Sequence, residues 1–312
     1  MNFNQKVSIL ITVYYNSEFL SQCLNSVINQ TYRNLQICLV NDGSTDNSLD
    51  IISNYADKDS RIEYISKENS GVADTRNHLL NMAKGDYVLF VDSDDWIEPD
   101  MVEYLINTMV KYNADIVCCE TVKEKENKPD LREIEFGLED ILKKFLLHKE
   151  MNGSLCNKLI KINLLHNERF HCGISYGEDA LFCWGVFQKV NKVVMSNKQL
   201  YNYRMNDDSI SHQTFGPKKL SGHTTWDLIC SEADKKYPEI SSCGKARWGM
   251  ESTLLLNSAV KSDYPKDNSI KMLQKTVKKN YKFMRYHKIT SIKGLIFAFV
   301  ISRVYGSWAK YF

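Results

Sequence analysis

The sequence YVLFVDSDDW at residues 87–96 is the stretch on which the interpretation of the chain depends. Its first five residues form a short apolar run rich in β-branched and aromatic side chains, which is typical of a buried strand. The run ends abruptly in Asp92, Ser93, Asp94 and Asp95. Because unpaired buried charge costs too much free energy, we expect these carboxylates to face water, a cation or a positively charged group.

Two interpretations of this acidic turn are open. Carboxylate ligands two positions apart suit Mg²⁺ or Mn²⁺, and ligands of open α/β sheets sit at the carboxyl ends of strands. This favours a metal-assisted site for a nucleotide or a sugar phosphate. The alternative is structural, with Asp95 capping a helix that has Pro99 in its first turn.

The composition is that of an ordinary globular protein except near the C-terminal end. Of the 312 residues, 43% are hydrophobic and 25% are charged, and the net charge is +2. No Asp or Glu follows Asp267, whereas ten basic residues do, which leaves 30 basic and 38 acidic residues in the rest of the chain. A tail of one sign predicts an anionic partner, either a phospholipid surface or a nucleic acid.

Cysteine usage and hydropathy predict a cytoplasmic protein. The nine cysteines are odd in number, irregularly spaced and without a CxxC pair, which favours reduced thiols. We recognise no signal peptide, and no apolar stretch reaches the roughly 18–20 residues of a spanning helix.

Strand and helix patterns alternate through the first part of the chain. Strands are expected at 6–13, 35–40, 61–65, 87–91 and 114–119, and helices at 18–29, 45–55, 71–84 and 99–112, with Gly85 as the stop of the third helix. This alternation predicts βαβ units and a largely parallel sheet. A crevice along its carboxyl edge would gather the polar residues at the strand ends, namely Thr12, Tyr14, Asp42, Asp92 and Asp94.

The second half is less regular at first. We expect an exposed loop at 123–130, helices at 138–148 and from Glu178 to about 188, and a strand at 200–204. Carboxylates in a first helical turn often only complement the helix dipole, so Glu178 and Asp179 alone do not establish a site. Further helices are expected at 224–233, 246–260, 270–286 and 291–312.

The last expected helix combines apolar, aromatic and basic residues. Ile292, Ile296, Phe299 and Trp308 fall on one broad face. That combination favours a helix lying among lipid headgroups. The alternative is a helix that packs on the domain and exposes a solvated basic face.

These segments together resemble the inverting glycosyltransferases of family 2. The matching motifs stand in the family's order: VSILITVYYN at 7–16, NQTYRNLQICLVNDGSTDNS at 29–48, KENSGVADTRN at 67–77, GDYVLFVDSDDW at 85–96, CNKL at 156–159 and YGEDALF at 176–182. The resemblance implies an α/β GT-A fold, that is, a Rossmann-like, mostly parallel sheet flanked by helices, with a helical C-terminal extension. It divides the chain into a catalytic domain at 1–215, with a nucleotide-sugar half at 1–120 and an acceptor half at 121–215, and a basic helical region at 216–312.

The resemblance also implies which residues hold the donor. Thr12 and Tyr14 would line the base pocket, and Asp42 would accept the N3 proton of uracil. Arg76 would reach the diphosphate as a fixed cation. Ser93 would contact the nucleotide-sugar together with the carboxylate that precedes it.

The same resemblance assigns metal binding and proton transfer to residues of the acidic motifs. Asp94 and Asp92 would bind Mn²⁺ or Mg²⁺, with Asp95 and His212 as further candidate ligands. Asp179 would be the general base. The QxxRW signature of processive synthases is absent, which argues against processive polymer synthesis.

The sequence therefore predicts a metal-dependent, inverting enzyme that transfers one sugar from a UDP-sugar to a hydroxyl of a glycan or a lipid-linked acceptor in surface polysaccharide assembly. Residues 270–312 would hold it to the anionic inner face of the cell membrane. One alternative is a sugar-phosphate nucleotidyltransferase, which should have a glycine-rich loop where this chain reads TVYYNSE at 12–18. The other is a non-catalytic, membrane-associated assembly subunit. Nucleic-acid binding is not expected, because the tail resembles no recognised module.

Overall fold

The computed structural model describes residues 5–122, 130–205 and 214–306. The chain forms two compact units. The first comprises Met1–Leu138, Ser154–Cys172 and Gly185–Met205, and the second comprises Glu139–Gly153, Gly173–Trp184 and Asn206–Phe312.

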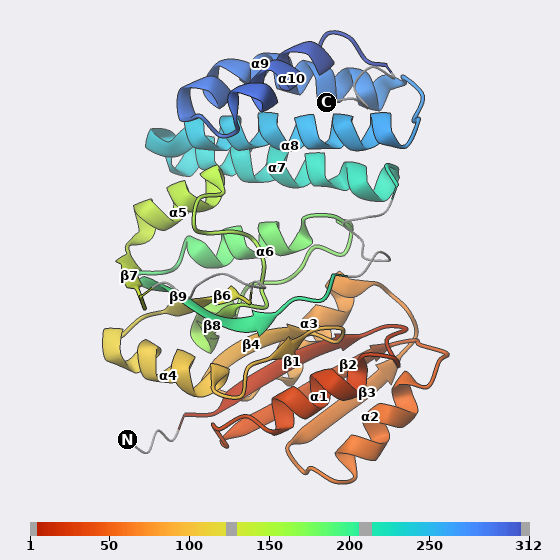
Figure 1. Cartoon of the computed structure of the whole chain (residues 1–312), viewed down its shortest axis with the longest axis vertical. Coiled ribbons are helices and arrows are strands. Elements are labelled where there is room, and N and C mark those ends of the chain that lie inside the picture. Colours follow the sequence, from red (N-terminus) through yellow and green to blue (C-terminus); the bar gives the residue numbers. More distant parts are fainter. Residues whose placement is uncertain (1–4, 123–129, 206–213, 307–312) are drawn as a thin grey trace. The chain divides into compact units, whose positions relative to one another are not determined.

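The first unit is built on a mixed sheet, which has nine strands within the described residues (Figure 1). Its strands run in the order β3-β2-β1-β4-β8-β6-β9-β5, and β7 pairs with β9. Their bounds are β1 (Val7–Val13), β2 (Leu35–Asp42), β3 (Ile62–Lys67), β4 (Tyr87–Asp92), β5 (Trp96–Ile97), β6 (Ile116–Thr121), β7 (Glu133–Phe136), β8 (Lys158–Lys161) and β9 (Val193–Asn202). Strands β3, β2, β1 and β4 are parallel, β8 is antiparallel to both of its neighbours, and β9 is parallel to β6. The predicted α/β fold, with a mostly parallel sheet flanked by helices, is confirmed.

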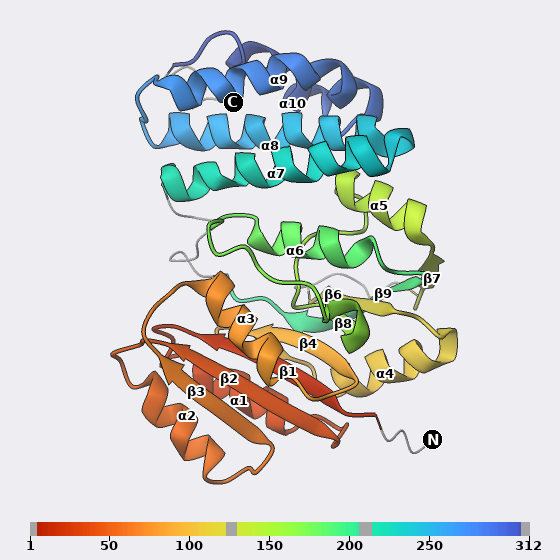
Figure 2. The same cartoon turned by 180° about the vertical axis from the view of Figure 1, so that it is seen from behind.

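Helices cover both faces of the parallel half of this sheet. Helices α1 (Leu20–Ile28) and α2 (Ser48–Ala56) lie on the face seen in Figure 1, and α3 (Val72–Met82) lies on the face seen in Figure 2. Helix α4 (Met101–Tyr112) packs against β6 and β9. Alternate residues of β1, such as Ile9 and Ile11, are fully buried with Cys23 and Leu24 of α1. The apolar stripe of α1 has the spacing that fits one helix face, which is why the sequence pattern located it.

The register of the parallel strands brings their polar ends together. Thr12 of β1 stands opposite Asp92 of β4, and Asp42 of β2 stands opposite Lys67 of β3. These residues share the carboxyl edge of the sheet, where open α/β folds bind their ligands.

The strands β5, β7 and β8 were not predicted, and β9 begins at Val193 rather than at residue 200. Strand β5 has only two residues, which is too short for a pattern. Strand β8 reads KLIK, and its buried Lys158 hides the apolar alternation. These strands of the second half of the sheet therefore depend on pairing with distant strands rather than on local pattern.

Gly85 is not the stop of α3, as was expected. The helix ends at Met82, and Ala83 is already extended. A Cβ atom added at Gly85 would lie 2.6 Å from the carbonyl oxygen of Lys6 and 2.7 Å from the nitrogen of Ser8. Glycine is required here because the chain enters β4 in close contact with the backbone of β1.

The second unit is helical. It holds α7 (Pro217–Lys236), α8 (Ser241–Lys261), α9 (Asn268–His287) and α10 (Ile292–Ile301), together with most of α5 (Leu138–Leu147) and the start of α6 (Glu178–Phe187). Leu256, Ile270, Leu273 and Val277 are among the residues of a separate core that α8, α9 and α10 share. The predicted helical extension is confirmed.

Helix α10 is shorter than the helix expected at 291–312. It ends at Ile301, with Ser302 at its C-cap, and Trp308 lies outside the described residues. No helix in the described part of the chain is long and apolar enough to span a bilayer.

We expect Gly85→Ala to lower the free energy of unfolding by about 1–3 kcal/mol, because the methyl group must displace the backbone of β1. The free energy is measured by urea denaturation. Gly137→Ala is the matched control, since nothing lies within 4 Å of a Cβ atom there. The control should change stability by less than about 0.5 kcal/mol. Equal effects of the two substitutions would contradict the proposed close approach.

Candidate functional site

Asp42 is a buried carboxylate with a cationic partner. It ends β2 and is 4% exposed. Lys67 Nζ forms an ion pair with its Oδ1 atom, and the backbone N–H groups of Ser70 and Gly71 donate to Oδ1 and Oδ2, each at 3.0 Å. Burial acts to raise the pKa of Asp42, but the bonds from Lys67, Ser70 and Gly71 outweigh it and hold the pKa below its ordinary value. Asp42 is therefore an ionised acceptor at neutral pH.

An exposed aromatic pair follows β1. Thr12 is partly buried, whereas Tyr14 and Tyr15 are 53% and 52% exposed. The two rings meet edge to face at 4.7 Å, and the hydroxyl of Tyr15 bonds to that of Thr45 at 2.7 Å. This bond holds Tyr15 to the loop after β2, so Tyr14 remains as an accessible aromatic ring beside the sheet edge.

Asp92 closes β4 and the acidic turn begins there. The N–H of Asp95 donates to the carbonyl oxygen of Asp92 at 3.1 Å, which closes the turn. The thiol of Cys156 donates to Oδ2 of Asp92 at 3.0 Å, and Nη2 of Arg76 lies 3.8 Å from Oδ1. The side chain of Asp92 is still 38% exposed, so it can also reach a ligand.

Ser93 and Asp94 differ in their surroundings. Ser93 is buried, and its hydroxyl accepts a bond from Nδ2 of Asn16 at 2.6 Å. Asp94 is partly buried, and burial, followed by the charge of Asp92, raises its pKa. Nε of Arg204 donates to the carbonyl oxygen of Asp94 at 2.8 Å. Asp94 is thus held by its backbone while its carboxylate is crowded by a like charge.

Asp95 is tied to β9 and its extension. The hydroxyl of Tyr201 donates to Oδ2 at 2.6 Å, and the N–H of Arg204 donates to Oδ1 at 2.8 Å. Burial raises the pKa of Asp95 to about 7, with the two neighbouring carboxylates adding to the rise and the two donors opposing it. The alternative in which Asp95 caps a helix is wrong, because α4 begins only at Met101.

Four residues of this site were not predicted, namely Lys67, Cys156, Tyr201 and Arg204. Lys67 and Cys156 open the motifs KENSG and CNKL, so a signal for them was present. Tyr201 and Arg204 lie where only a strand was expected. Arg204 also stacks on two rings, with its guanidinium 4.4 Å from the centre of Phe19 and 4.9 Å from that of Trp96.

The donor set of the turn fits a hard divalent cation. Within the described residues, no three His, Cys, Asp or Glu side chains gather as a metal site. Mg²⁺ and Mn²⁺ need only one or two carboxylates when phosphate oxygens and water complete the shell. Asp92 and Asp94 supply two. Burial, followed by the charge of Asp92, raises the pKa of Asp94, and a cation would relieve the repulsion between the two carboxylates. The candidate ligand His212 lies outside the described residues.

Asp179 belongs to the second unit. It lies in the first turn of α6, and its Oδ1 atom accepts a bond from the N–H of Ala180 at 2.7 Å. Gly177, just before the helix, has a φ of 82°, a conformation that favours glycine. The first unit thus holds the predicted donor residues together with Asp92, Asp94 and Asp95, and the second unit carries the predicted base.

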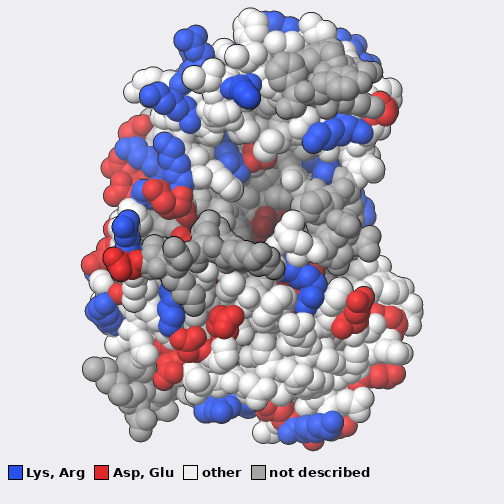
Figure 3. Space-filling model, in the orientation of Figure 1, with Lys and Arg blue, Asp and Glu red and all other residues white. Residues whose placement is uncertain are grey.

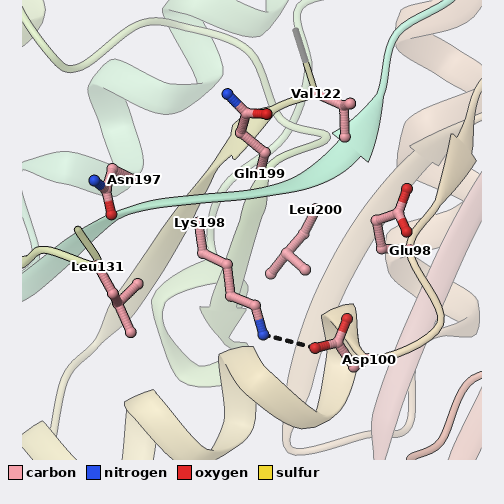
Figure 4. Close-up of a pocket in the computed structure, with 8 residues that line it drawn as sticks. All are labelled: Glu98, Asp100, Val122, Leu131, Asn197, Lys198, Gln199 and Leu200. Carbon is pink, nitrogen blue, oxygen red and sulfur yellow. Dashed lines mark hydrogen bonds and ion pairs between the residues drawn. The ribbon is translucent and has the colours of Figure 1, made fainter. Parts of the chain in front are cut away.

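A cavity of about 400 Å³ lies elsewhere in the first unit (Figure 4). Lys198 and Asp100 form an ion pair of 2.6 Å across it. None of the predicted site residues lines it; its lining consists of Glu98, Asp100, Val122, Leu131, Asn197, Lys198, Gln199 and Leu200. We therefore assign it no part in the chemistry of the acidic turn.

Comparison with known proteins places this geometry in a family. The model of the family described as glycosyl transferase family 2 matches residues 8–169. Glycosyltransferase GlyA of Streptococcus pneumoniae serotype 4 is 37% identical over 224 residues, which are 68% of this chain and 32% of GlyA. Cholesterol galactosyltransferase of Borreliella burgdorferi is 32% identical over 244 residues, which are 73% of this chain and 68% of that protein. The match to GlyA thus spans only about a third of that relative.

A solved structure shares the fold over most of its length. The structure of TarS residues 1–349 from S. aureus, in complex with UDP-GlcNAc, superposes with a TM-score of 0.68 at 19% sequence identity. The superposition covers 95% of this chain and 90% of that one. The likeness therefore extends to the helical second unit.

We expect Asp42→Asn to lower the free energy of unfolding by about 1–3 kcal/mol at pH 7, because bonds to a charged acceptor are lost. The pKa of Asp42 is lowered by folding, so its contribution is present above the unfolded pKa of 3.8 and is lost as pH falls through the folded value. The difference between wild type and variant should therefore shrink below about pH 4.

Denaturant titrations from pH 7 down to pH 3 measure this difference. Asp57→Asn, at the exposed end of α2, is the control and should show a small, pH-independent change. A difference for Asp42→Asn that grows toward low pH would contradict the assignment of Asp42 as ionised.

Proposed function

Because the chain belongs to glycosyl transferase family 2 and is a glycosyltransferase, we propose that it transfers one sugar, with inversion, from a UDP-sugar to a hydroxyl of a glycan or lipid-linked acceptor in surface polysaccharide assembly. The observation that carries the proposal is the gathering of Asp42, Arg76, Asp92 and Asp94 along one carboxyl edge of the sheet. Asp42 suits the base of a nucleoside diphosphate sugar, and Arg76 suits its diphosphate. Asp92 and Asp94 suit a metal ion bound to that diphosphate.

Recognition of the base rests on Asp42. A carboxylate accepts the N3–H of uracil, whereas cytosine presents an acceptor at N3 and would be repelled. The lowered pKa of Asp42 keeps it an acceptor at neutral pH. Tyr14 offers an exposed ring against which the base stacks. The UDP-GlcNAc bound to TarS supports a uridine donor here, because the two proteins share a fold.

The diphosphate binds at the end of β4, next to Arg76 of helix α3. Arg76, which is 11% exposed beside Asp92, supplies a fixed positive charge. Asp94 and Asp92 would hold Mg²⁺ or Mn²⁺, and the bound cation supplies charge neutralisation for the departing diphosphate. Cys156 and Arg204 orient these two residues through the bonds described above. Asp95, half protonated near pH 7, serves the turn as a buried structural group.

Proton transfer falls to Asp179. The acceptor hydroxyl is a weak nucleophile, and a carboxylate takes its proton as the oxygen attacks the anomeric carbon. A single in-line displacement inverts the configuration, and no covalent sugar–enzyme bond forms. The helix dipole favours the ionised form of a carboxylate at the start of a helix, and only the ionised form can accept a proton.

We expect the chain to release UDP, rather than pyrophosphate, from one UDP-sugar in the presence of Mg²⁺ or Mn²⁺. Asp94→Asn should remove this metal-dependent release. Asp179→Asn should leave the Kd of UDP within about twofold and slow the release by 10²–10⁴-fold, the usual contribution of a general base. Asp50→Asn, an exposed site on α2, is the control.

Each outcome of this panel has one meaning. Release of pyrophosphate would identify a nucleotidyltransferase. UDP binding without turnover would show that release requires a specific acceptor, whereas absence of both turnover and nucleotide binding would favour a non-catalytic subunit. An Asp179→Asn variant as fast as wild type would show that another group is the base.

The membrane-facing part of the proposal rests on α10. Ile292, Ile296 and Phe299, which we call the apolar stripe of α10, are 78%, 51% and 43% exposed and lie about one turn apart. The guanidinium of Arg303 lies 3.6 Å from the ring centre of Phe299, and Lys293 is exposed. Lys and Arg predominate over the C-terminal helices on the face in Figure 3. An apolar stripe with basic flanks fits the anionic inner face of the cell membrane.

We expect the double substitution Ile292→Ser and Ile296→Ser to weaken binding to vesicles of mixed phosphatidylglycerol and phosphatidylcholine by about tenfold or more, because both side chains lose apolar burial in the lipid. Co-sedimentation measures the affinity. Leu254→Ser on α8, where Leu254 is 47% exposed, is the matched control and should bind as wild type does. Unchanged binding of the double variant would place the contact with lipid elsewhere.

A further inference from the structure

The loop that leads to Asp179 is fastened to helix α7. The N–H groups of Ser175 and Tyr176 both donate to the hydroxyl of Ser221, at 3.2 and 3.0 Å. The hydroxyl of Thr225, one turn along α7, donates to the carbonyl oxygen of Tyr176 at 3.2 Å. All of these residues lie in the second unit. The backbone on both sides of the Tyr176 side chain is therefore bonded to one face of α7.

The ring of Tyr176 occupies the space left by a glycine. A Cβ atom at Gly222 would lie 2.6 Å from Cδ1 and 3.3 Å from Cε1 of Tyr176. Gly222 lies inside α7, where alanine would be the better helix former. The next residue of the loop, Gly177, packs on Thr225, since a Cβ atom there would meet its Cγ2 atom at 3.2 Å. Close packing thus fixes the chain two residues before Asp179.

Helix α8 adds charged groups around the same loop. Nη2 of Arg247 lies 2.6 Å from Oε1 of Glu251, and each side chain is 12% exposed. The guanidinium of Arg247 also lies 4.8 Å from the ring centre of Trp226 on α7. Burial, and then the charge of Asp179, raises the pKa of Glu251, while Arg247 lowers it. Asp179 is therefore within electrostatic reach of this pair.

We propose that helix α7 positions the general base. Its residues Ser221, Gly222 and Thr225 hold Tyr176 and Gly177 in place. This fixes the position of the Asp179 carboxylate when it takes the proton of the acceptor. Gly222 is then a positioning residue that acts through Asp179. The proposal rests on the proposed function, which assigns the base to Asp179. It goes beyond the family match, because that match ends at residue 169 and includes neither Asp179 nor α7.

The test compares Gly222→Ala with Gly244→Ala. Both are buried glycines within long helices of the second unit, but a Cβ atom at Gly244 meets its nearest neighbour at an ordinary 3.6 Å. We expect Gly222→Ala to lower kcat for UDP release about tenfold or more, since a displacement of about 1 Å can cost 10²-fold. The Kd of UDP should stay within about twofold of wild type. Gly244→Ala should match wild type in both measurements.

A second comparison separates positioning from general damage. In an Asp179→Asn background the base is already absent, so adding Gly222→Ala should cause no further loss of the residual rate. Equal proportional losses in both backgrounds would overturn the proposal. Tyr176→Ala in the Gly222→Ala background removes the clash, because no Cδ1 atom remains, and recovery of kcat toward that of Tyr176→Ala alone is expected.

The assignment of the base and its positioning by α7 can be tested separately. If Asp179→Asn is as fast as wild type, the assignment of the base is wrong, and the positioning role of α7 is wrong with it. If Asp179→Asn is slow but folded Gly222→Ala is as fast as wild type, only the positioning role of α7 is wrong. Should Gly222→Ala not fold, Ser221→Ala replaces it, because it removes the acceptor of two N–H groups without adding volume. A Ser221→Ala variant with wild-type kcat would then overturn the proposal.

Discussion

Crowding of negative charge at the end of β4 is the constraint around which the first unit is built. Asp92, Asp94 and Asp95 stand within four residues of one another. Two like charges about 4 Å apart repel by about 4 kcal/mol where the effective dielectric constant is ~20. The cluster survives because other segments surround it with donors and cations: Arg76 from α3, Cys156 before β8, and Tyr201 and Arg204 at the end of β9. The mixed second half of the sheet delivers three of these four groups.

The pKa values of two buried carboxylates of this edge are shifted in opposite directions. Lys67 and two backbone N–H groups keep Asp42 charged. The hydroxyl of Tyr201 and the backbone N–H of Arg204, which donate to Asp95, are both neutral groups. Burial raises the pKa of Asp95 to about 7. Much of the negative charge that the turn presents to a cation therefore comes from Asp92 and Asp94. The neutral fraction of Asp95 reduces the repulsion that these two would otherwise feel.

The sequence could predict those strands, helices and site residues whose signal lies within a few neighbouring positions of the chain. The parallel half of the sheet was located because each strand is a short apolar run and each helix carries an apolar stripe. The carboxylates were located because charged residues directly after an apolar run are too costly to bury unpaired, and this signal lies within a few neighbouring residues.

Strand β8 was missed because Lys158 is buried with its Nζ atom bonded to the carbonyl oxygen of Ser154 and to Oδ1 of Asn157. A buried lysine of this kind is indistinguishable in sequence from a solvated one. The partners of the carboxylates escaped prediction for a related reason: Tyr201 and Arg204 reach Asp95 across more than 100 positions of the chain, and that pairing exists only once the order of β6, β9 and β5 is known.

The division of the chain into two units has a consequence for specificity. The proposed donor residues lie in the unit whose core includes Ile9 and Leu89. The start of α6, which carries the proposed base, belongs to the helical unit, whose C-terminal helices have a core of their own. Most of the proposed donor residues lie at or next to strand ends, and all of them fall within the family match at residues 8–169. On the proposed function, the choice of acceptor depends on groups near the proposed base, Asp179. The groups identified there, Tyr176, Arg247 and Glu251, lie in the second unit and beyond residue 169, where the family match ends. On this proposal, donor and acceptor recognition depend on different units of the chain, so a substitution in one unit is expected to change one without changing the other.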